Sequence, residues 1–188
     1  MSEAALWRKL HAFTIISTLE VSYWLIDVLF YDTPLCAYET QNPYATAFLA
    51  ICGGFHIGYR TNSALNIPRD WKMALHHILA MFLAYALVFY TPVKLCFAIS
   101  IVHDVPDIFV NILRLARRRE EHVWAAYTAH MMAWMVFRLW LFTRLIVAFW
   151  GECSCVVGYV CMMLLGLHWI WFIDFIKLGL RRSAASRE

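Results

Sequence analysis

Long apolar runs separated by short polar segments form the dominant pattern of this chain. The runs cover, approximately, residues 10–30, 44–59, 72–90, 93–114, 124–150 and 156–178. A helix that crosses a bilayer needs about 20 mostly apolar residues, since each residue advances it by about 1.5 Å. The pattern therefore predicts an all-α, polytopic integral membrane protein with six transmembrane helices around a central cavity, folded as a single domain over residues 1–188.

The composition agrees with this prediction. Hydrophobic residues make up 62% of the chain and charged residues only 15%, with 13 Phe and 9 Trp. A soluble domain of this composition would expose many apolar side chains to water, which excludes that class. The formal net charge is +3, but the basic residues form short clusters between apolar runs. Without a basic stripe carrying interleaved aromatic residues, no nucleic-acid partner is expected.

The distribution of Lys and Arg predicts the topology. Basic residues precede the first run and follow the second, fourth and sixth. The loops after the first and fifth runs have none, and the turn after the third has only Lys94. By the positive-inside rule, both termini are expected in the cytosol and the Lys94 turn on the lumenal or external side.

Titratable residues inside the third and fourth runs indicate a functional site. His76 and His77 are followed, after 25 residues, by His103, Asp104 and Asp107. The turn is expected at Tyr90-Thr91-Pro92, because Pro lacks an N–H and favours the start of a helix. Two antiparallel helices that meet there would bring the five residues to the same depth, about 20 Å from the turn and in the cytosolic half of the membrane.

His103, Asp107 and Asn111 follow one another at intervals of four residues and share a helix face, whereas Asp104 points about 100° away. An ionised carboxylate at the bilayer centre costs about 2.5 kcal/mol or more, so these groups should face the protein interior, opposite His76 and His77. A structural interpretation stays open, with interfacial histidines and carboxylates that hydrogen-bond neighbouring helices.

The arrangement His76-His77, 25 residues, His103-Asp104-x-x-Asp107 resembles the signature of the TLC-domain family, and within it most closely the ceramide synthases. Further segments that resemble this family are Trp7-Arg8, Met73-x-Leu75, Thr143-Arg144-Leu145, and Gly166-Leu167-x-x-x-Trp171 followed by Lys177.

The resemblance implies transfer of a fatty acyl group from acyl-CoA, as co-substrate, to the amine of a sphingoid base, in the endoplasmic reticulum and without a metal or cofactor. His76 or His77 would act as the base or as the acyl-carrying nucleophile. Asp104 or Asp107 would orient that imidazole, and His103 completes the catalytic set. The expected partners are membrane lipid, acyl-CoA and a sphingoid base, and a homodimer stays open.

Four residues outside this set are expected to bind substrate: Asn111, Arg138, Arg144 and His168. Arg138 lies near the middle of the fifth run and needs a carboxylate partner, for which Glu20 is the candidate. Arg144 lies nearer the lumenal end, where its side chain can reach the interface. His168, like His56 and His130, is expected either to line the cavity or to pack in a helix interface.

Three cysteines lie in predicted lumenal loops. Because the lumen is oxidising, we expect Cys36 to form a disulfide with Cys153 or Cys155.

Two other functions stay open. One is a non-catalytic TLC-like protein that binds lipid or regulates membrane composition. The small size supports it, as do Pro92 and Lys94, which stand where ceramide synthases usually carry Asn-x-x-Arg. The other is a metal-dependent hydroxylase or hydrolase, since three His and two Asp could bind zinc or iron. The HxxxH and HxxHH boxes expected of diiron membrane hydroxylases do not occur in the sequence.

Overall fold

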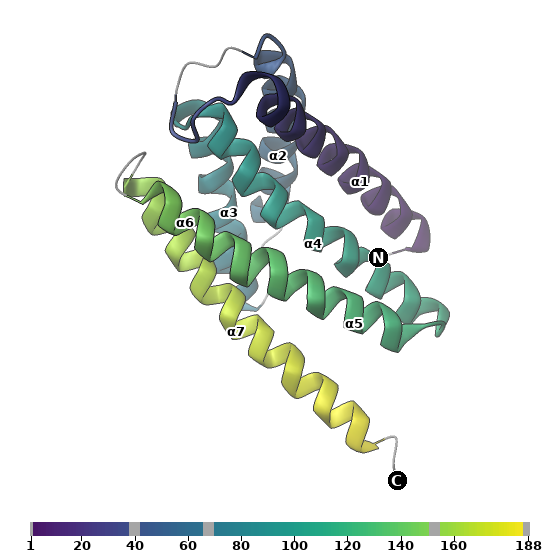
Figure 1. Ribbon diagram of the computed structural model, residues 1–188. Helices are drawn as coiled ribbons and strands as arrows, with labels where there is room; N and C mark the ends of the chain where they lie inside the picture. Colours follow the sequence, from purple (N-terminus) through teal and green to yellow (C-terminus); the bar gives the residue numbers. More distant parts are fainter. Residues whose placement is uncertain (1, 38–41, 66–69, 151–154, 186–188) are drawn as a thin grey trace.

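The chain forms six helical rods in a computed structural model that describes residues 2–37, 42–65, 70–150 and 155–185 (Figure 1). The first rod is α1, Glu3–Ile26, continued by the π-helical segment η1, Asp27–Tyr31. It is followed by α2, Ala45–Leu65, α3, Trp71–Tyr90, and α4, Val93–Arg119. The fifth rod is continuous through α5, Val123–Ala133, the π-helical η2, Trp134–Leu141, and α6, Phe142–Phe149, and the last is α7, Cys155–Ala185.

Five of these rods are long and apolar enough to cross a membrane: residues 3–31, 71–90, 93–119, 123–149 and 156–181. The fold class predicted from the sequence, an all-α polytopic membrane protein, is therefore confirmed. The second predicted span is a helix, α2, but it is not among the five. It has 21 residues, a sufficient length, yet three glycines, His56 and Arg60 make it less apolar.

The predicted turn between the third and fourth helices is correct, since α3 ends at Tyr90 and α4 begins at Val93. The ends on the predicted cytosolic side extend beyond the apolar runs. α1 begins at Glu3, α4 continues to Arg119 and α7 to Ala185. Hydropathy marks only the part of a helix that suits lipid, whereas the helix itself continues through Arg, Lys and Glu, which are good helix formers.

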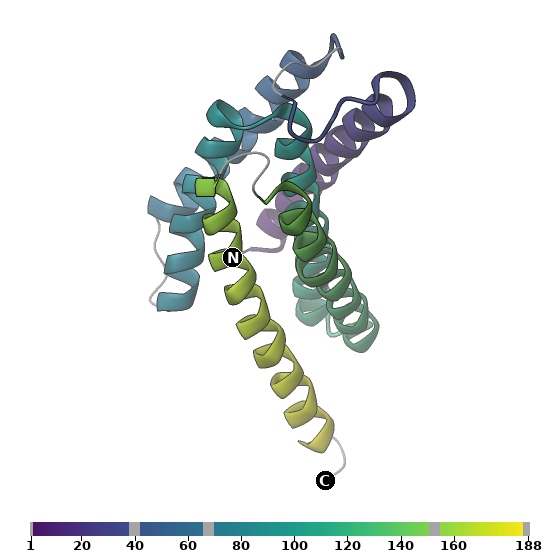
Figure 2. The same cartoon turned by 60° about the vertical axis from the view of Figure 1, so that its left-hand side comes forward.

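The central helix of the bundle is α4, which packs on α1 along one side and on the α5–η2–α6 rod along another. α3 packs mainly on α2 and α7 (Figure 2). α3 and α4 are consecutive, but they pack on each other less closely than on these other neighbours. The predicted α3–α4 hairpin is thus opened apart, and the two helices face each other across cavities lined by residues of both.

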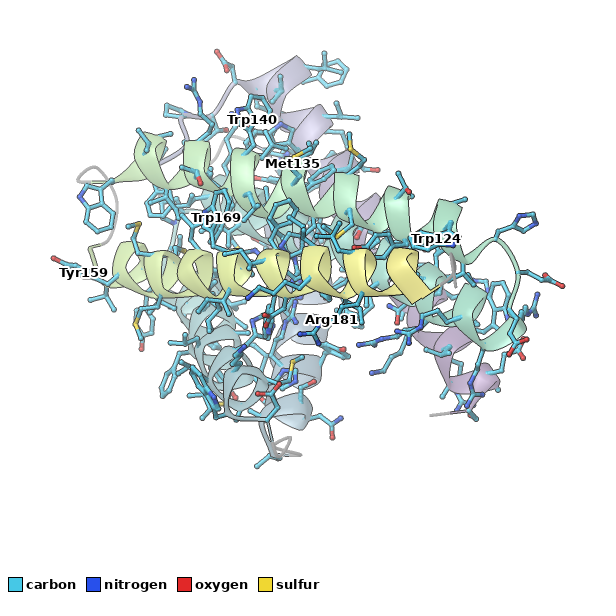
Figure 3. All side chains as sticks on the ribbon, turned by 90° about the horizontal axis from the view of Figure 1, so that it is seen from below. Trp124, Met135, Trp140, Tyr159, Trp169 and Arg181 are labelled. Atoms are coloured by element: carbon cyan, nitrogen blue, oxygen red, sulfur yellow. The ribbon has the colours of Figure 1, made fainter. Side chains whose placement is uncertain are left out.

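Apolar side chains fill the interior and also cover the outside. Leu95, Ile99, Phe142, Phe149 and Leu164 belong to a buried cluster formed mainly by α3, α4, α6 and α7. On the outer face of α5, η2 and α7, residues such as Trp140 and Trp169 are exposed (Figure 3). An apolar outer surface of this kind belongs in lipid, which agrees with the membrane assignment. The C-terminal part of α7 extends past the other helices (Figure 1).

Cys36, just after the first rod, is disulfide-bonded. Cys52, Cys96 and Cys161 are free and buried. The side chains of the two predicted partners, Cys153 and Cys155, lie outside the described residues.

Candidate functional site

Four imidazoles from three helices form a row across the middle of the bundle. We call His77, His76, His168 and His103 the imidazole row. Successive ring centroids lie 5.5 Å apart for His77 and His76, 6.3 Å for His76 and His168, and 5.2 Å for His168 and His103. The sequence predicted that the histidines of α3 and α4 would meet. In the structure they meet through His168 of α7.

Several ring nitrogens of the row have no hydrogen-bond partner among the described residues. His103 Nδ1 lies 2.8 Å from the carbonyl oxygen of Ile99, so this nitrogen carries the proton and Nε2 is left unpaired. His76 Nδ1 and both nitrogens of the fully buried His168 are also unpaired. A buried polar atom without a partner costs about 1–3 kcal/mol. Such atoms are available to a substrate, because binding one would remove this cost.

Beside the row, six side chains, alternately acidic and basic, form a continuous chain that links α1, α2, α4 and η2. We call it the charge network, and its members in order are Glu20, His56, Asp104, Arg60, Asp107 and Arg138. His56 Nε2 lies 2.6 Å from Glu20 Oε1 and 3.3 Å from Asp104 Oδ2. Arg60 Nη2 lies 3.3 Å from Asp104 Oδ1 and 3.9 Å from Asp107 Oδ2.

Arg138 closes the network at its other end. Its Nη2 donates to Asp107 Oδ1 and, at 2.9 Å, to the carbonyl oxygen of His103. Pro106, inside α4, lacks the N–H that would normally bond the carbonyl oxygen of Val102 one turn back. The π-helical turn of η2 carries Arg138, and such segments are frequent at functional sites.

These pairings correct two predictions. Asp104 or Asp107 was expected to orient His76 or His77, but the ion-pair partners of these acids among the described residues are His56, Arg60 and Arg138. Glu20 was a candidate partner of Arg138, and it pairs with His56 instead. His103 and Asp104 are adjacent in sequence but face different neighbours, because successive side chains of a helix point about 100° apart.

Two cavities meet at this site. The inner chamber, about 40 Å³, lies between α3 and α4 and is mainly apolar, with Ala80, Leu83, Ala84 and Leu87 in its wall. The outer chamber, about 200 Å³, is lined by three arginines, Arg60, Arg114 and Arg138, together with aromatic side chains. An apolar chamber next to a cationic one matches the polarity of a molecule with an alkyl chain and an anionic head.

His76 and Arg60 line both chambers. Asp104 and His103 face the inner chamber, whereas His77, Asp107, Asn111 and Arg138 face the outer one. We call the position shared by His76 and Arg60 the neck. A reacting group that joins an alkyl chain to an anionic head would lie at this neck.

The other predicted binding residues have different positions. Asn111 is buried, donates from Nδ2 to the carbonyl oxygen of Asp107 at 2.8 Å, and lines the outer chamber. Arg144 is exposed and lies on the outside of the bundle in a groove between α1, α4 and α6, apart from both chambers. His130 is buried against Trp134 and Phe175 and lines neither chamber.

Three members of the charge network have the residue types of a metal site. One ligand atom each of Glu20, His56 and Asp104 lies within 4.8 Å of the others. His56 Nε2 lies 2.6 Å from Glu20 Oε1, and Arg60 Nη2 lies 3.3 Å from Asp104 Oδ1, so a metal at this position would compete with these contacts. The set also differs from the three His and two Asp that the sequence suggested for zinc or iron.

Arg60 and Arg114 line the chambers and are candidate site residues that sequence reasoning missed. The second apolar run ends at Tyr59, so Arg60 was counted as a basic loop residue, but in the structure it lies inside α2 and is buried. Its signal was its position four residues after His56, which puts both on one helix face.

Comparison with known families agrees with this architecture. The family described as the TLC domain matches residues 5–177, which include every member of the imidazole row and of the charge network. No curated protein and no solved structure matches the chain. The chain belongs to the TLC-domain family.

Proposed function

We propose that this protein is a ceramide synthase-like N-acyltransferase that moves a fatty acyl group from acyl-CoA to the amine of a sphingoid base. The observation that carries this proposal is His76, buried at the neck between an apolar and a cationic chamber with an unpaired Nδ1. Its signature with His103, Asp104 and Asp107 resembles that of the ceramide synthases.

Each of the two chambers would bind a different part of acyl-CoA. The acyl chain would occupy the inner chamber, and the phosphates of CoA would bind near Arg60, Arg114 and Arg138. At about 40 Å³ the inner chamber has room for only a few water molecules. Entry of an acyl chain therefore requires α3 and α4 to separate further, which their sparse mutual contacts permit.

At the neck, the amine nitrogen attacks the thioester carbonyl, so that a C–N bond forms and the C–S bond breaks. His76 Nδ1 either accepts the proton of the amine and returns it to the leaving CoA thiolate, or attacks the thioester first and carries the acyl group. In both routes negative charge develops on the carbonyl oxygen. Arg60 is suited to stabilise it, since its Nη2 is held by two carboxylates and its other N–H groups have no hydrogen-bond partner in the described residues.

The proposal includes a location in the endoplasmic reticulum with cytosolic termini. The outer chamber would then open toward cytosolic acyl-CoA. The disulfide of Cys36 supports this topology, because it lies at the opposite end of the first rod from the N-terminus and disulfides persist in oxidising compartments.

The test is expression in cells that lack ceramide synthase, followed by analysis of their lipids. We expect ceramide to reappear with the wild-type chain and to stay absent with His76→Ala at equal protein level. Absence of ceramide with a well-expressed wild-type chain would reject the proposal.

One observation favours a second function, non-catalytic lipid binding. Asp104 and Asp107, the acids of the signature, form ion pairs with other side chains rather than with His76. Acyl-CoA supplied to purified protein separates the two functions, because a binder saturates without releasing CoA.

A further inference from the structure

A further cavity lies on the outside of the bundle, away from the two chambers. It is a groove of about 490 Å³ between α1 and the η2–α6 part of the fifth rod, with α4 as its floor. Trp24 lies on the α1 side, Ala98 and Val102 on α4, and Arg144 and Ala148 on α6. Except for Arg144, every residue that lines it is apolar.

The groove exists because α1 and α6 both pack on α4, and because small side chains lie between them. Ala98 on α4 and Ala148 on α6 leave space that larger residues would fill. The surrounding surface is apolar and exposed, as for Leu25 at 52% and Val147 at 71%. Since α1, α4 and α6 belong to membrane-spanning rods, the groove opens to lipid.

α4 separates the groove from the functional site. The inner chamber is lined by Ile99, His103 and Asp104, whereas the groove is lined by Ala98, Ile101 and Val102 from another face of the same helix. A molecule in the groove therefore would not reach the imidazole row.

Arg144 differs from the other arginine of its rod. Arg138 is buried and paired with Asp107, whereas Arg144 is exposed and has no hydrogen bond or ion pair with any described residue. Arg144 lies five residues before the end of α6 at Phe149, about 7.5 Å along the axis. A cation at that depth on a lipid-facing surface is stabilised by a nearby anion. In a bilayer, the phosphate of a lipid headgroup is the anion within reach.

We propose that this groove binds a phospholipid, with an acyl chain along α4 between α1 and α6 and with the lipid phosphate on Arg144. The occupant comes from the leaflet near the Cys36 end of the first rod, since the first and fifth rods run in the same direction and both end there (Figure 1). The guanidinium can donate two parallel hydrogen bonds to one phosphate. This site does not depend on the proposed acyltransferase activity.

The test measures lipid binding to delipidated protein in detergent by native mass spectrometry. Phosphatidylglycerol is the probe, and diacylglycerol, which has the same chains without the phosphate, is the control ligand. We expect one tightly bound phosphatidylglycerol and at least about tenfold weaker binding of diacylglycerol, the difference that one charge-assisted pair typically makes. Equal binding of the two lipids would overturn the proposal.

Two variants test the two halves of the site. Arg144→Gln removes the phosphate contact, and Ala148→Trp fills the groove from an exposed position, so neither disturbs the core. Both should weaken phosphatidylglycerol binding by about tenfold or more. Arg181→Gln, at an exposed position on α7, is the matched control and should bind as the wild type does. Unchanged phosphatidylglycerol binding by Arg144→Gln would contradict the proposal. The proposal would also fail if the protein were a dimer and Ala148→Trp dissociated it without changing lipid binding, since the groove would then be a protein interface.

Discussion

The imidazole row and the charge network lie side by side, share helix α4, and differ in how their polar atoms are satisfied. Each acidic member of the network lies next to a basic one, from Glu20 at one end to Arg138 at the other. In the row, His76, His103 and His168 keep ring nitrogens without partners among the described residues. Adjacent residues of α4, His103 and Asp104, belong to the two different groups.

This difference indicates that the network serves stability and the row serves catalysis. A buried charge is tolerated when it is paired, and the network joins four helical segments through such pairs. An unpaired imidazole carries a cost in the free protein and can recover it by binding a reacting group. We infer that the network fixes the positions of the helices and that the row, with Arg60 at the neck, performs the chemistry.

The largest effect on activity is expected from a substitution in the imidazole row. His76→Ala should lower acyl transfer by about 10³-fold, within the range of general acid–base catalysis, because no other described imidazole lines both chambers. The melting temperature should fall modestly, because loss of the buried ring leaves a cavity beside Trp171 and His168. Ceramide formation in membranes is the readout, and His11→Ala, at an exposed histidine, is the control. Near wild-type ceramide formation by His76→Ala would remove the row from the mechanism.

Substitutions in the charge network should mainly lower the stability of the fold. Asp104→Asn leaves Arg60 and His56 without their shared carboxylate, and loss of one partner of a buried ion pair costs about 3–5 kcal/mol. We expect a clearly lower melting temperature in detergent, together with lower activity. The double change Glu20→Gln with Asp104→Asn should cost less than the sum of the single changes, because both partners of His56 are removed together. Strict additivity would mean that the network is not one unit.

Arg60 lies between the two groups, and a conservative change tests which one it serves. Arg60→Lys keeps the charge but replaces the planar guanidinium, whose Nη2 lies near both Asp104 and Asp107, with a single ammonium group. We expect kcat to fall by about 10²-fold, the loss typical of one oxyanion donor, with KM for acyl-CoA nearly unchanged. An increase in KM at constant kcat would instead assign Arg60 to substrate binding alone.

The smallest effect is expected from an ion pair outside the network. Lys72 Nζ lies 2.9 Å from Asp174 Oδ2 at the surface. Exposed pairs contribute about 0–1 kcal/mol, so Lys72→Gln should hardly change the melting temperature. A loss as large as that of Asp104→Asn would show that burial does not distinguish the network from surface pairs.

Sequence reasoning predicted the helices well and the contacts between them less well. Runs of apolar residues located the rods, and Pro92 located the turn between α3 and α4, because these signals act within one helix. The partners of Asp104, Asp107 and Arg138 depend on which helices are neighbours, and spacing along a helix fixes a face without fixing what lies opposite.

Two further features had only weak local signals. Arg60 was assigned to a loop because hydropathy falls after Tyr59 although α2 continues to Leu65. The π-helical turn at Trp134–Leu141, which carries Arg138, has no sequence signature that the apolar pattern reveals. The family signature found His76, His77, His103, Asp104 and Asp107, yet their division into a row and a network emerged only from the packing of α2 and α7.

The most direct test of the central claim is release of CoA from acyl-CoA by the purified protein, measured with and without a sphingoid base. We predict release that requires the base, produces an equal amount of N-acylated amine, and disappears in His76→Gln at an unchanged melting temperature. Saturable binding of acyl-CoA without release of CoA, or equal release by His76→Gln, would contradict it.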